Sequence, residues 1–333
     1  MSHPVPHAAR PTLLLTFLLV STVLIAAEPT PRPRPQTAAK PSFSPQSLAY
    51  VLQADKLARP RAAAVKRLAE CNRDLIVLDA GYNTESDGKW TNADIQQIRN
   101  GKPGRRVVAY VSIGEAESYR PYWHKTWADK NGHPTSQAPK FLGPANPDWP
   151  GNYRAKYWNP QWQAIIGDSI DAVVRQGFDG IYLDIVDGFE FFEFDAAKND
   201  YIDDRKNPET GHTYRQDMIR WVLALAARAR AQTGEKFLVI PQNASQLLVD
   251  PQYLKTIDAI GVEDLFTNGN KKQPPKAVSE RLGDLRVAMK AGKPVLAIEY
   301  GTQPTARAAS EHGVRQHGLI LLLTDRKLTG RDL

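Results

Sequence analysis

The sequence has a single cysteine, Cys71, in 333 residues, so the chain cannot form an internal disulfide. Beyond the N-terminal segment, the histidines form no ligand pair at helical or CxxC-like spacing, and the sequence has no combined Cys/His zinc motif. No glycine-rich phosphate loop follows the first strand-like runs. These absences argue against a zinc centre and against a nucleotide-binding open sheet.

Positive charge is present but is not concentrated. The formal net charge is +7, yet Lys and Arg are dispersed along the chain and form no block interleaved with aromatic residues. Proteins that bind nucleic acids usually carry such a basic patch. We therefore expect no nucleic-acid partner.

The longest apolar run lies at the N-terminus, where Arg10 precedes residues 13–27. The run is shorter than the roughly 18 residues of a membrane-spanning helix and ends in two alanines, which predicts a secretory signal over residues 1–27. An uncleaved membrane anchor is the alternative. Residues 28–46 are rich in proline and predict an extended linker. We expect an exported protein, periplasmic or extracellular, that contacts a membrane only if the leader stays attached.

From residue 47 onward, eight short apolar runs are interleaved with helical patterns. Most runs are nearly continuous in Val, Ile and Leu, which favours parallel strands buried on both faces. The runs are 48–52, 75–80, 107–113, 181–186, 237–240, 259–262, 295–298 and 319–323. Helices are expected over 160–176, 217–230 and 279–290, with a glycine beyond each. The order predicts an α/β fold, a single (β/α)8 TIM-like barrel over residues 47–333, with a doubly wound sheet as the alternative.

Carboxylates recur where these strands end. In a barrel of this kind the chemistry sits at the C-terminal ends of the strands. The acids found there are Asp79, Glu115, Glu117, Asp184, Asp187, Glu263, Asp264 and Glu299. Any one of them could instead cap a helix or hold a salt bridge. As a set they predict an acidic pocket that attracts a cationic ligand.

The longest connection, residues 118–159, is rich in Trp and Tyr and includes Tyr153. A long loop inside a compact domain is usually functional or disordered, and this one is too aromatic for disorder. Its rings could pack on one another or on the apolar faces of sugars. Beside an acidic pocket, the loop is expected to form a glycan-binding wall.

Together these segments resemble the endo-α-1,4-polygalactosaminidase family, glycoside hydrolase family 114. The matching segments occur in family order and are 112–120 (SIGEAESYR), 146–153 (NPDWPGNY), 177–187 (GFDGIYLDIVD), 242–243 (QN) and 261–266 (GVEDLF). The resemblance implies a TIM-like barrel. It also implies a substrate rich in α-1,4-linked galactosamine or N-acetylgalactosamine, such as fungal galactosaminogalactan or the bacterial Pel polymer.

The resemblance also assigns residues. The catalytic Asp and Glu of the family match Asp184 and Glu263, and by analogy with α-galactosidase barrels we expect Asp184 as nucleophile and Glu263 as general acid/base, with retention of configuration. Residues expected to hold the substrate are Asp79, Glu115, Glu117, Tyr153, Asp187, Asn243, Asp264 and Tyr300.

Two other functions are compatible with the same residues. The acid cluster could hold a divalent metal for a different hydrolysis, although such sites usually mix imidazole with carboxylate. The barrel could also bind glycans without cutting them, but a pure binder has no need of both Asp184 and Glu263. The favoured prediction is an endo-acting glycoside hydrolase that needs no cofactor or metal, acts as a monomer and has a galactosamine polysaccharide as its partner.

Overall fold

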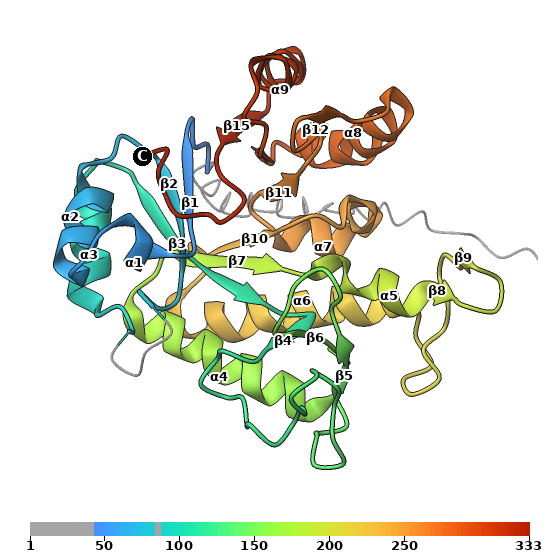
Figure 1. Ribbon diagram of the computed structural model, residues 1–333. Helices are drawn as coiled ribbons and strands as arrows, with labels where there is room; N and C mark the ends of the chain where they lie inside the picture. Colours follow the sequence, from blue (N-terminus) through green and yellow to red (C-terminus); the bar gives the residue numbers. More distant parts are fainter. Residues whose placement is uncertain (1–42, 84–87) are drawn as a thin grey trace, which may run out of the picture. The chain divides into compact units, whose positions relative to one another are not determined.

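The computed structural model describes residues 43–83 and 88–333 (Figure 1). Within these residues, eight parallel strands form two arcs, β1-β2-β3-β7-β10 and β11-β14-β15. The strands are β1 (Leu48–Val51), β2 (Leu75–Asp79), β3 (Arg106–Ser112), β7 (Gly180–Asp184), β10 (Leu238–Pro241), β11 (Ile260–Glu263), β14 (Val295–Glu299) and β15 (Ile320–Leu323). Each matches one of the eight predicted runs.

Backbone hydrogen bonds join the two arcs into a closed barrel. Between β10 and β11, the Asp258 N–H donates to the Val239 carbonyl at 2.8 Å, and Gln242 and Gly261 form a parallel bridge. On the other side, the Leu52 N–H after β1 donates to the Leu328 carbonyl beyond β15 at 2.9 Å. Closure satisfies the strand edges. The predicted α/β barrel is therefore confirmed.

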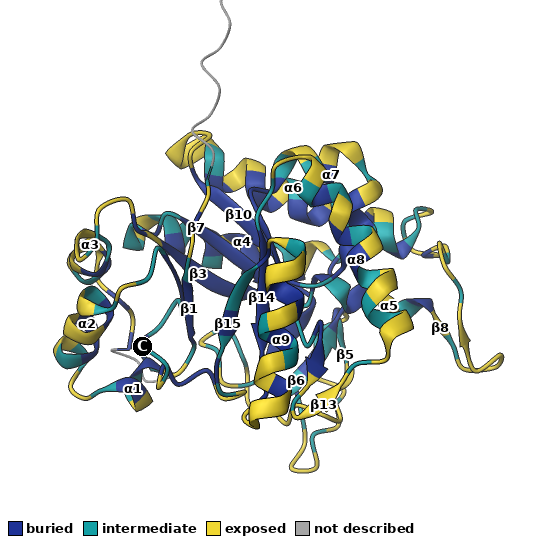
Figure 2. Ribbon diagram, turned by 90° about the horizontal axis from the view of Figure 1, so that it is seen from above, coloured by how far each residue is buried: buried dark blue, intermediate teal, exposed yellow. Residues whose placement is uncertain are grey.

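Helices cover the outside of the barrel (Figure 2). In the described residues they are α1 (Ala54–Leu57), α2 (Arg61–Glu70), α3 (Asn92–Asn100), α4 (Pro160–Gln176), α5 (Phe189–Glu193), α6 (Tyr214–Thr233), α7 (Pro251–Thr256), α8 (Pro275–Lys290) and α9 (Pro304–His317), with short 3-10 turns η1 (Val186–Gly188) and η2 (Ser245–Val249). The ends of α4 follow from its sequence. The Asn159 side chain accepts from the Gln161 N–H, and Gly177 ends the helix at φ 83°.

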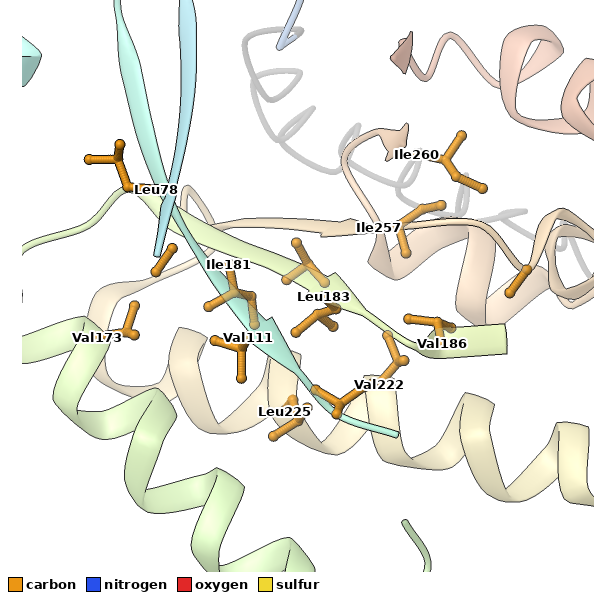
Figure 3. Packing of buried hydrophobic residues seen from close by; sticks show 14 of the residues in the cluster. Leu78, Val111, Val173, Ile181, Leu183, Val186, Val222, Leu225, Ile257 and Ile260 are labelled. Atoms are coloured by element: carbon orange, nitrogen blue, oxygen red, sulfur yellow. The ribbon is translucent and has the colours of Figure 1, made fainter. Parts of the chain in front are cut away.

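The helices pack on the outward side chains of the strands. Figure 3 shows Ile181 and Leu183 of β7 facing Val222 and Leu225 of α6. These side chains are buried, and each fully buried aliphatic side chain contributes about 1.5–3 kcal/mol of transfer free energy. This layer holds β7, and therefore the residues at its end, in a fixed position.

A second apolar layer fills the inside of the barrel. Side chains alternate across a strand, so the residues of one parity all point inward. The inward set contains Leu48 and Tyr50, Leu75 and Val77, Val108 and Tyr110, Tyr182, Leu238 and Ile240, Leu296 and Ile298, and Leu322. Continuing the same parity to the strand ends gives Asp79, Ser112, Asp184, Gln242, Glu263 and Tyr300. The polar site is thus the last inward layer above an apolar floor.

One inward position must be a glycine. A Cβ at Gly261 on β11 would lie 1.9 Å from the hydroxyl oxygen of Tyr182. The Tyr182 ring is fully buried and packs against Tyr50, with ring centroids 5.1 Å apart. Gly261 therefore leaves the space that this ring occupies below Glu263.

Three small sheets extend the barrel outside its eight strands. They consist of β4 (Glu115–Glu117), β5 (Leu142–Ala145) and β6 (Asn152–Ala155); β8 (Phe194–Asp195) and β9 (Asp200–Tyr201); and β12 (Thr267–Asn268) and β13 (Lys271–Lys272). The first lies largely in the long aromatic connection. None of the three was predicted from the sequence.

The predicted leader and most of the predicted linker lie outside the described residues. Among the helices in residues 43–83 and 88–333, none is long and apolar enough to span a membrane.

Candidate active site

A cavity of about 1120 Å³ opens where the barrel strands end. Active sites of (β/α)8 barrels lie at this end because the βα loops converge there. Of the ten residues predicted to form the site, those that line this cavity are Asp79, Glu117, Asp184, Asp187, Asn243, Glu263 and Tyr300. Glu115, Tyr153 and Asp264 do not line it. The structure thus brings both predicted catalytic carboxylates into one cavity.

Asp184 ends β7, and three donors hold its carboxylate. Its Oδ2 accepts a hydrogen bond from the Tyr110 hydroxyl at 2.7 Å. Its Oδ1 accepts from the Ile185 N–H at 2.8 Å and from the Gln242 amide at 2.9 Å. Burial raises the pKa of Asp184 to about 6, and the bonds from Tyr110 and Ile185 oppose this rise because they stabilise the anion. These donors fix the orientation of the carboxylate and favour its ionised form.

Glu263 ends β11 in a different environment. The Tyr300 hydroxyl donates to its Oε1, and the Gln242 amide donates to its Oε2 at 2.9 Å. Burial, and then the charge of Asp184, raise the pKa of Glu263 to about 8, while Tyr300 and Arg326 act in the opposite direction. The pKa of Glu263 is thus raised further than that of Asp184, which favours Glu263 as the group that keeps a proton. Glu263 is thus suited to donate a proton, and Asp184 is suited to act as an anion.

A single amide bridges the two acids. The Gln242 nitrogen lies 2.9 Å from Asp184 Oδ1 and 2.9 Å from Glu263 Oε2, so these oxygens can be no further apart than twice that distance, 5.8 Å. An amide nitrogen carries two N–H groups, one for each acceptor. Gln242 is only 2% exposed. The bridge consequently sets the spacing of the pair from within the barrel wall.

The backbone is strained directly after each of these three residues. Ile185, Asn243 and Asp264 have φ values of 55°, 59° and 49°. The left-handed region is unfavourable for residues other than glycine, most of all for a β-branched residue such as Ile185. Strain of this kind clusters at functional sites, where the surrounding structure maintains it. At each of the three strand ends, the left-handed residue changes the direction of the backbone directly after the residue whose side chain enters the cavity.

Arg120 joins two of the predicted substrate-binding acids. Its Nη1 donates to Asp79 Oδ1 at 2.9 Å, and its Nε donates to a Glu117 carboxylate oxygen. The Tyr119 hydroxyl donates to the other Glu117 oxygen at 2.7 Å. Burial lowers the pKa of Arg120, but the charges of the two carboxylates on either side of it raise this pKa and keep the guanidinium charged. Asp79 and Glu117 therefore enter the cavity wall as an ion-paired unit.

Asp187 lies in η1, just beyond Asp184, and interacts electrostatically with Arg281. Burial, followed by the charges of Asp184 and Glu190, raises its pKa to about 7, while a hydrogen bond with Asn243 lowers it. A cation bound beside a carboxylate stabilises the ionised form. Asp187 is therefore suited to binding an ammonium group.

The three remaining predicted residues have structural partners. Glu115 is fully buried and accepts from Asn146 Nδ2 at 2.8 Å and from Arg154. Tyr153 packs on the Trp123 ring with centroids 4.7 Å apart. Asp264 forms a two-pronged pair with Arg326, with both N–O distances 3.0 Å.

Glu299, another strand-end acid, points out of the barrel. Its neighbour Tyr300 has the inward parity, so Glu299 faces the helix layer and is fully buried. It accepts from the N–H groups of Leu265, Phe266 and Thr267 at 2.9–3.0 Å. It therefore fixes the chain that follows Glu263.

Several cavity residues were not predicted as part of the site. They are Tyr50, Tyr110, Arg120, Gln242 and Arg326. Strand parity could have indicated Tyr110 and Gln242, because both share the inward face with Asp184. Arg326 comes from the C-terminal tail, and its guanidinium carbon lies 4.3 Å from the Tyr300 ring centroid. No sequence signal links it to the site. In the part of the chain that the structure describes, no group of three or more His, Cys, Asp and Glu side chains is placed to hold a metal ion.

An α/β barrel with two adjacent carboxyl groups at its strand ends has the arrangement that glycoside hydrolysis requires. The sequence matches the glycoside-hydrolase family GH114 over residues 29–332, and the chain belongs to this family. It is a glycoside hydrolase.

The chain is also similar to two uncharacterized proteins and, in its fold, to two solved structures. An uncharacterized protein of Deinococcus radiodurans is 38% identical over 77% of this chain and 74% of its own length. An uncharacterized protein of Methanocaldococcus jannaschii is 36% identical over 72% of this chain and 64% of its own length. The glycoside hydrolase domain of PelA from Pseudomonas aeruginosa has a TM-score of 0.57 at 18% identity, covering 86% of this chain and 97% of that domain. Ega3 of Aspergillus fumigatus, solved with galactosamine, has a TM-score of 0.56 at 20% identity, covering 85% of this chain and 91% of that one.

Proposed function

We propose that this enzyme cleaves α-1,4-linked galactosamine or N-acetylgalactosamine polymers within the chain, with Asp184 as nucleophile and Glu263 as general acid/base. The observation that carries the proposal is the bridged pair of carboxyl groups with pKa values on either side of neutrality. The apolar run at residues 13–27 supports export of the enzyme to the compartment that holds such polymers.

The spacing of the pair supports retention of configuration. Retaining glycosidases separate their carboxyl groups by about 5–5.5 Å, whereas inverting enzymes need about 6.5–9.5 Å to admit a water molecule. The Gln242 bridge keeps Asp184 Oδ1 and Glu263 Oε2 within 5.8 Å of each other, which is closer to the spacing of retaining enzymes. In the first step Asp184 attacks the anomeric carbon while Glu263 protonates the leaving oxygen. In the second, Glu263 takes a proton from water, which attacks the anomeric carbon and releases Asp184.

The galactosamine specificity is supported by charge and by similarity. Asp187 and Glu190 line the same cavity as the catalytic pair. The resemblance of the motifs to polygalactosaminidases, and the galactosamine complex of the similar Ega3, favour an amino sugar. The ammonium group of galactosamine would stabilise the ionised form of Asp187.

The pH dependence of kcat/KM should be bell-shaped. Asp184 must be ionised, so activity rises as the pH passes its pKa of about 6. Glu263 must be protonated, so activity falls as the pH passes about 8. The maximum is therefore expected near pH 7. Initial rates between pH 4 and about 10 would test this profile, and activity that keeps rising into the alkaline range would contradict Glu263 as the acid.

Replacing Tyr300 by Phe should move only the alkaline limb. The Tyr300 hydroxyl lowers the pKa of Glu263, so its removal raises that pKa and extends activity to higher pH. Tyr182→Phe is the matched control, because the buried Tyr182 hydroxyl has no hydrogen-bond partner among the described residues. An equal shift in both variants would argue against the proposed role of Tyr300.

Size-resolved analysis of products tests the proposed function. The wild-type enzyme should convert α-1,4-galactosamine polymer to short oligomers, with Asp184→Asn as the inactive reference. Partly and fully acetylated polymers, together with an α-linked galactose polymer, separate amino-sugar recognition from general α-glycosidase activity. Cleavage of the galactose polymer alone would overturn the substrate assignment and leave the acid pair intact.

A further inference from the structure

The exposed aromatic side chains gather at one place. Among the residues that the structure describes, five aromatic side chains are classed as exposed, and all five line the catalytic cavity: Tyr119, Trp149, Phe191, Phe194 and Tyr201. We refer to these five as the aromatic rim. Apolar groups concentrated on one surface usually mark a binding site, whereas single exposed ones need no explanation.

The long connection contributes only part of the rim. Most of its aromatic residues pack on other rings, as Trp127 does on Trp123 and Tyr157 does on Trp158, and are buried or half-buried. Tyr119 and Trp149 remain 45% and 52% exposed on the cavity side. Of the described residues in this loop, Tyr119 and Trp149 are therefore the two rings that form the predicted aromatic wall of the cavity.

The rest of the rim comes from α5 and the β8–β9 hairpin. In α5, Phe192 stacks on Tyr214 with centroids 5.3 Å apart and anchors the helix, while the adjacent Phe191 points outward. Across the hairpin, Phe194 and Tyr201 pair directly with ring centroids 5.2 Å apart. Figure 1 shows this hairpin projecting beyond α5.

The base of the hairpin is held firmly. Glu193 is 1% exposed and accepts two hydrogen bonds from Arg215, at 2.8 and 3.0 Å. The Ile202 N–H donates to the Glu193 carbonyl at 3.0 Å, and Arg205 donates to the carbonyl of Phe194 at 2.8 Å. The hairpin thus presents its rings in a fixed arrangement, which lowers the entropy lost on binding.

We propose that the aromatic rim binds sugar units of the polymer that lie away from the bond being cleaved, and so makes the enzyme prefer long chains. This inference rests on the proposed function. The rim lines one cavity with Asp184 and Glu263, and Glu190, next to Phe191 in the chain, lines the same cavity and can accept hydrogen bonds from ammonium groups. Flat rings cover the apolar C–H faces of sugars while neighbouring acids bind the amines. A cationic glycan chain fits both features.

The test measures binding in a catalytically inactive protein. Asp184→Asn is the reference, and the double change Phe194→Ala with Tyr201→Ala is made in it. Isothermal titration uses a short galactosamine oligomer and a long galactosamine polymer. Loss of the two rings should weaken polymer binding on the order of tenfold or more and leave oligomer binding unchanged. Val249→Ala, which removes an apolar group 73% exposed outside the cavity, should change neither.

Any of the four following results would overturn the inference. Unchanged polymer affinity in the double variant would exclude the hairpin from binding, and equal loss for both ligands would show a local rather than a remote effect. If the reference dimerises through the rim, sedimentation would show a mass that falls in the double variant, and the rim would be a protein interface. Lack of any binding by the reference would overturn the proposed substrate together with this inference, so the two failures are distinguishable. Replacing both rings by Trp keeps the aromatic faces and should restore polymer affinity.

Discussion

The Glu263→Gln enzyme should lose activity on galactosamine polymer by a factor on the order of 10³ or more, and Asp184→Asn should lose at least as much. Glutamine cannot donate the proton that the leaving sugar needs, and asparagine cannot attack the anomeric carbon. Both substitutions keep the size of the side chain and the bridge from Gln242 can adapt to either, so circular dichroism and thermal unfolding should show an intact fold. Initial rates of reducing-end formation measure the loss.

An aryl glycoside with a good leaving group separates the two roles. Such a group departs without protonation, so Glu263→Gln should still form the glycosyl-enzyme and release a burst of aryl product. Asp184→Asn should give no burst, because the covalent intermediate cannot form. Azide should rescue the second step in Glu263→Gln, since an anionic nucleophile needs no general base. Reversal of these two patterns would mean that the roles of Asp184 and Glu263 are exchanged.

Replacing Arg120 by Met should destabilise the enzyme by about 3–5 kcal/mol, because it leaves Asp79 and Glu117 in the wall without their shared counter-charge. Activity should also fall, since both acids line the cavity beside the catalytic pair. Urea denaturation of the purified variant measures the free energy of unfolding.

Arg228→Met is the matched control. Arg228 also bridges two acids, Asp168 and Asp171, but its side chain is 41% exposed and lies on the helix surface. Loss of an exposed pair should cost about 1 kcal/mol or less. Equal destabilisation of the Arg120 and Arg228 variants would contradict the buried, structural character of the Arg120 unit.

The barrel could be predicted because its signals are local. Continuous apolar runs such as 107–113 and 181–186 need burial on both faces, and the glycine after residue 176 ends a helix with a clear apolar face. The small sheets could not be predicted in the same way. The β8–β9 hairpin has only two residues in each strand and is held by Arg205 and by Arg215 of α6, whose partners lie 11 and 22 residues away in the chain.

The site could be predicted only in part, because the sequence does not determine which face of its strand each end residue occupies. Sequence patterns locate the end of a strand, but which face each end residue takes depends on the register of the closed barrel. Glu263 and Glu299 both end strands, yet one lines the cavity and the other faces the helices. Gln242 carries no charge and gave no signal by itself. Its importance follows only from its position between two acids that are 21 and 58 residues away in the chain.

The most direct test is time-resolved NMR of the anomeric protons released from an α-1,4-galactosamine oligomer. The close spacing of Asp184 and Glu263 predicts that the new reducing end appears first as the α-anomer and then equilibrates to the β-anomer. Initial appearance of the β-anomer would show inversion and contradict the roles assigned to the bridged pair. Absence of any new reducing end, from an enzyme with an intact fold, would contradict the proposed substrate.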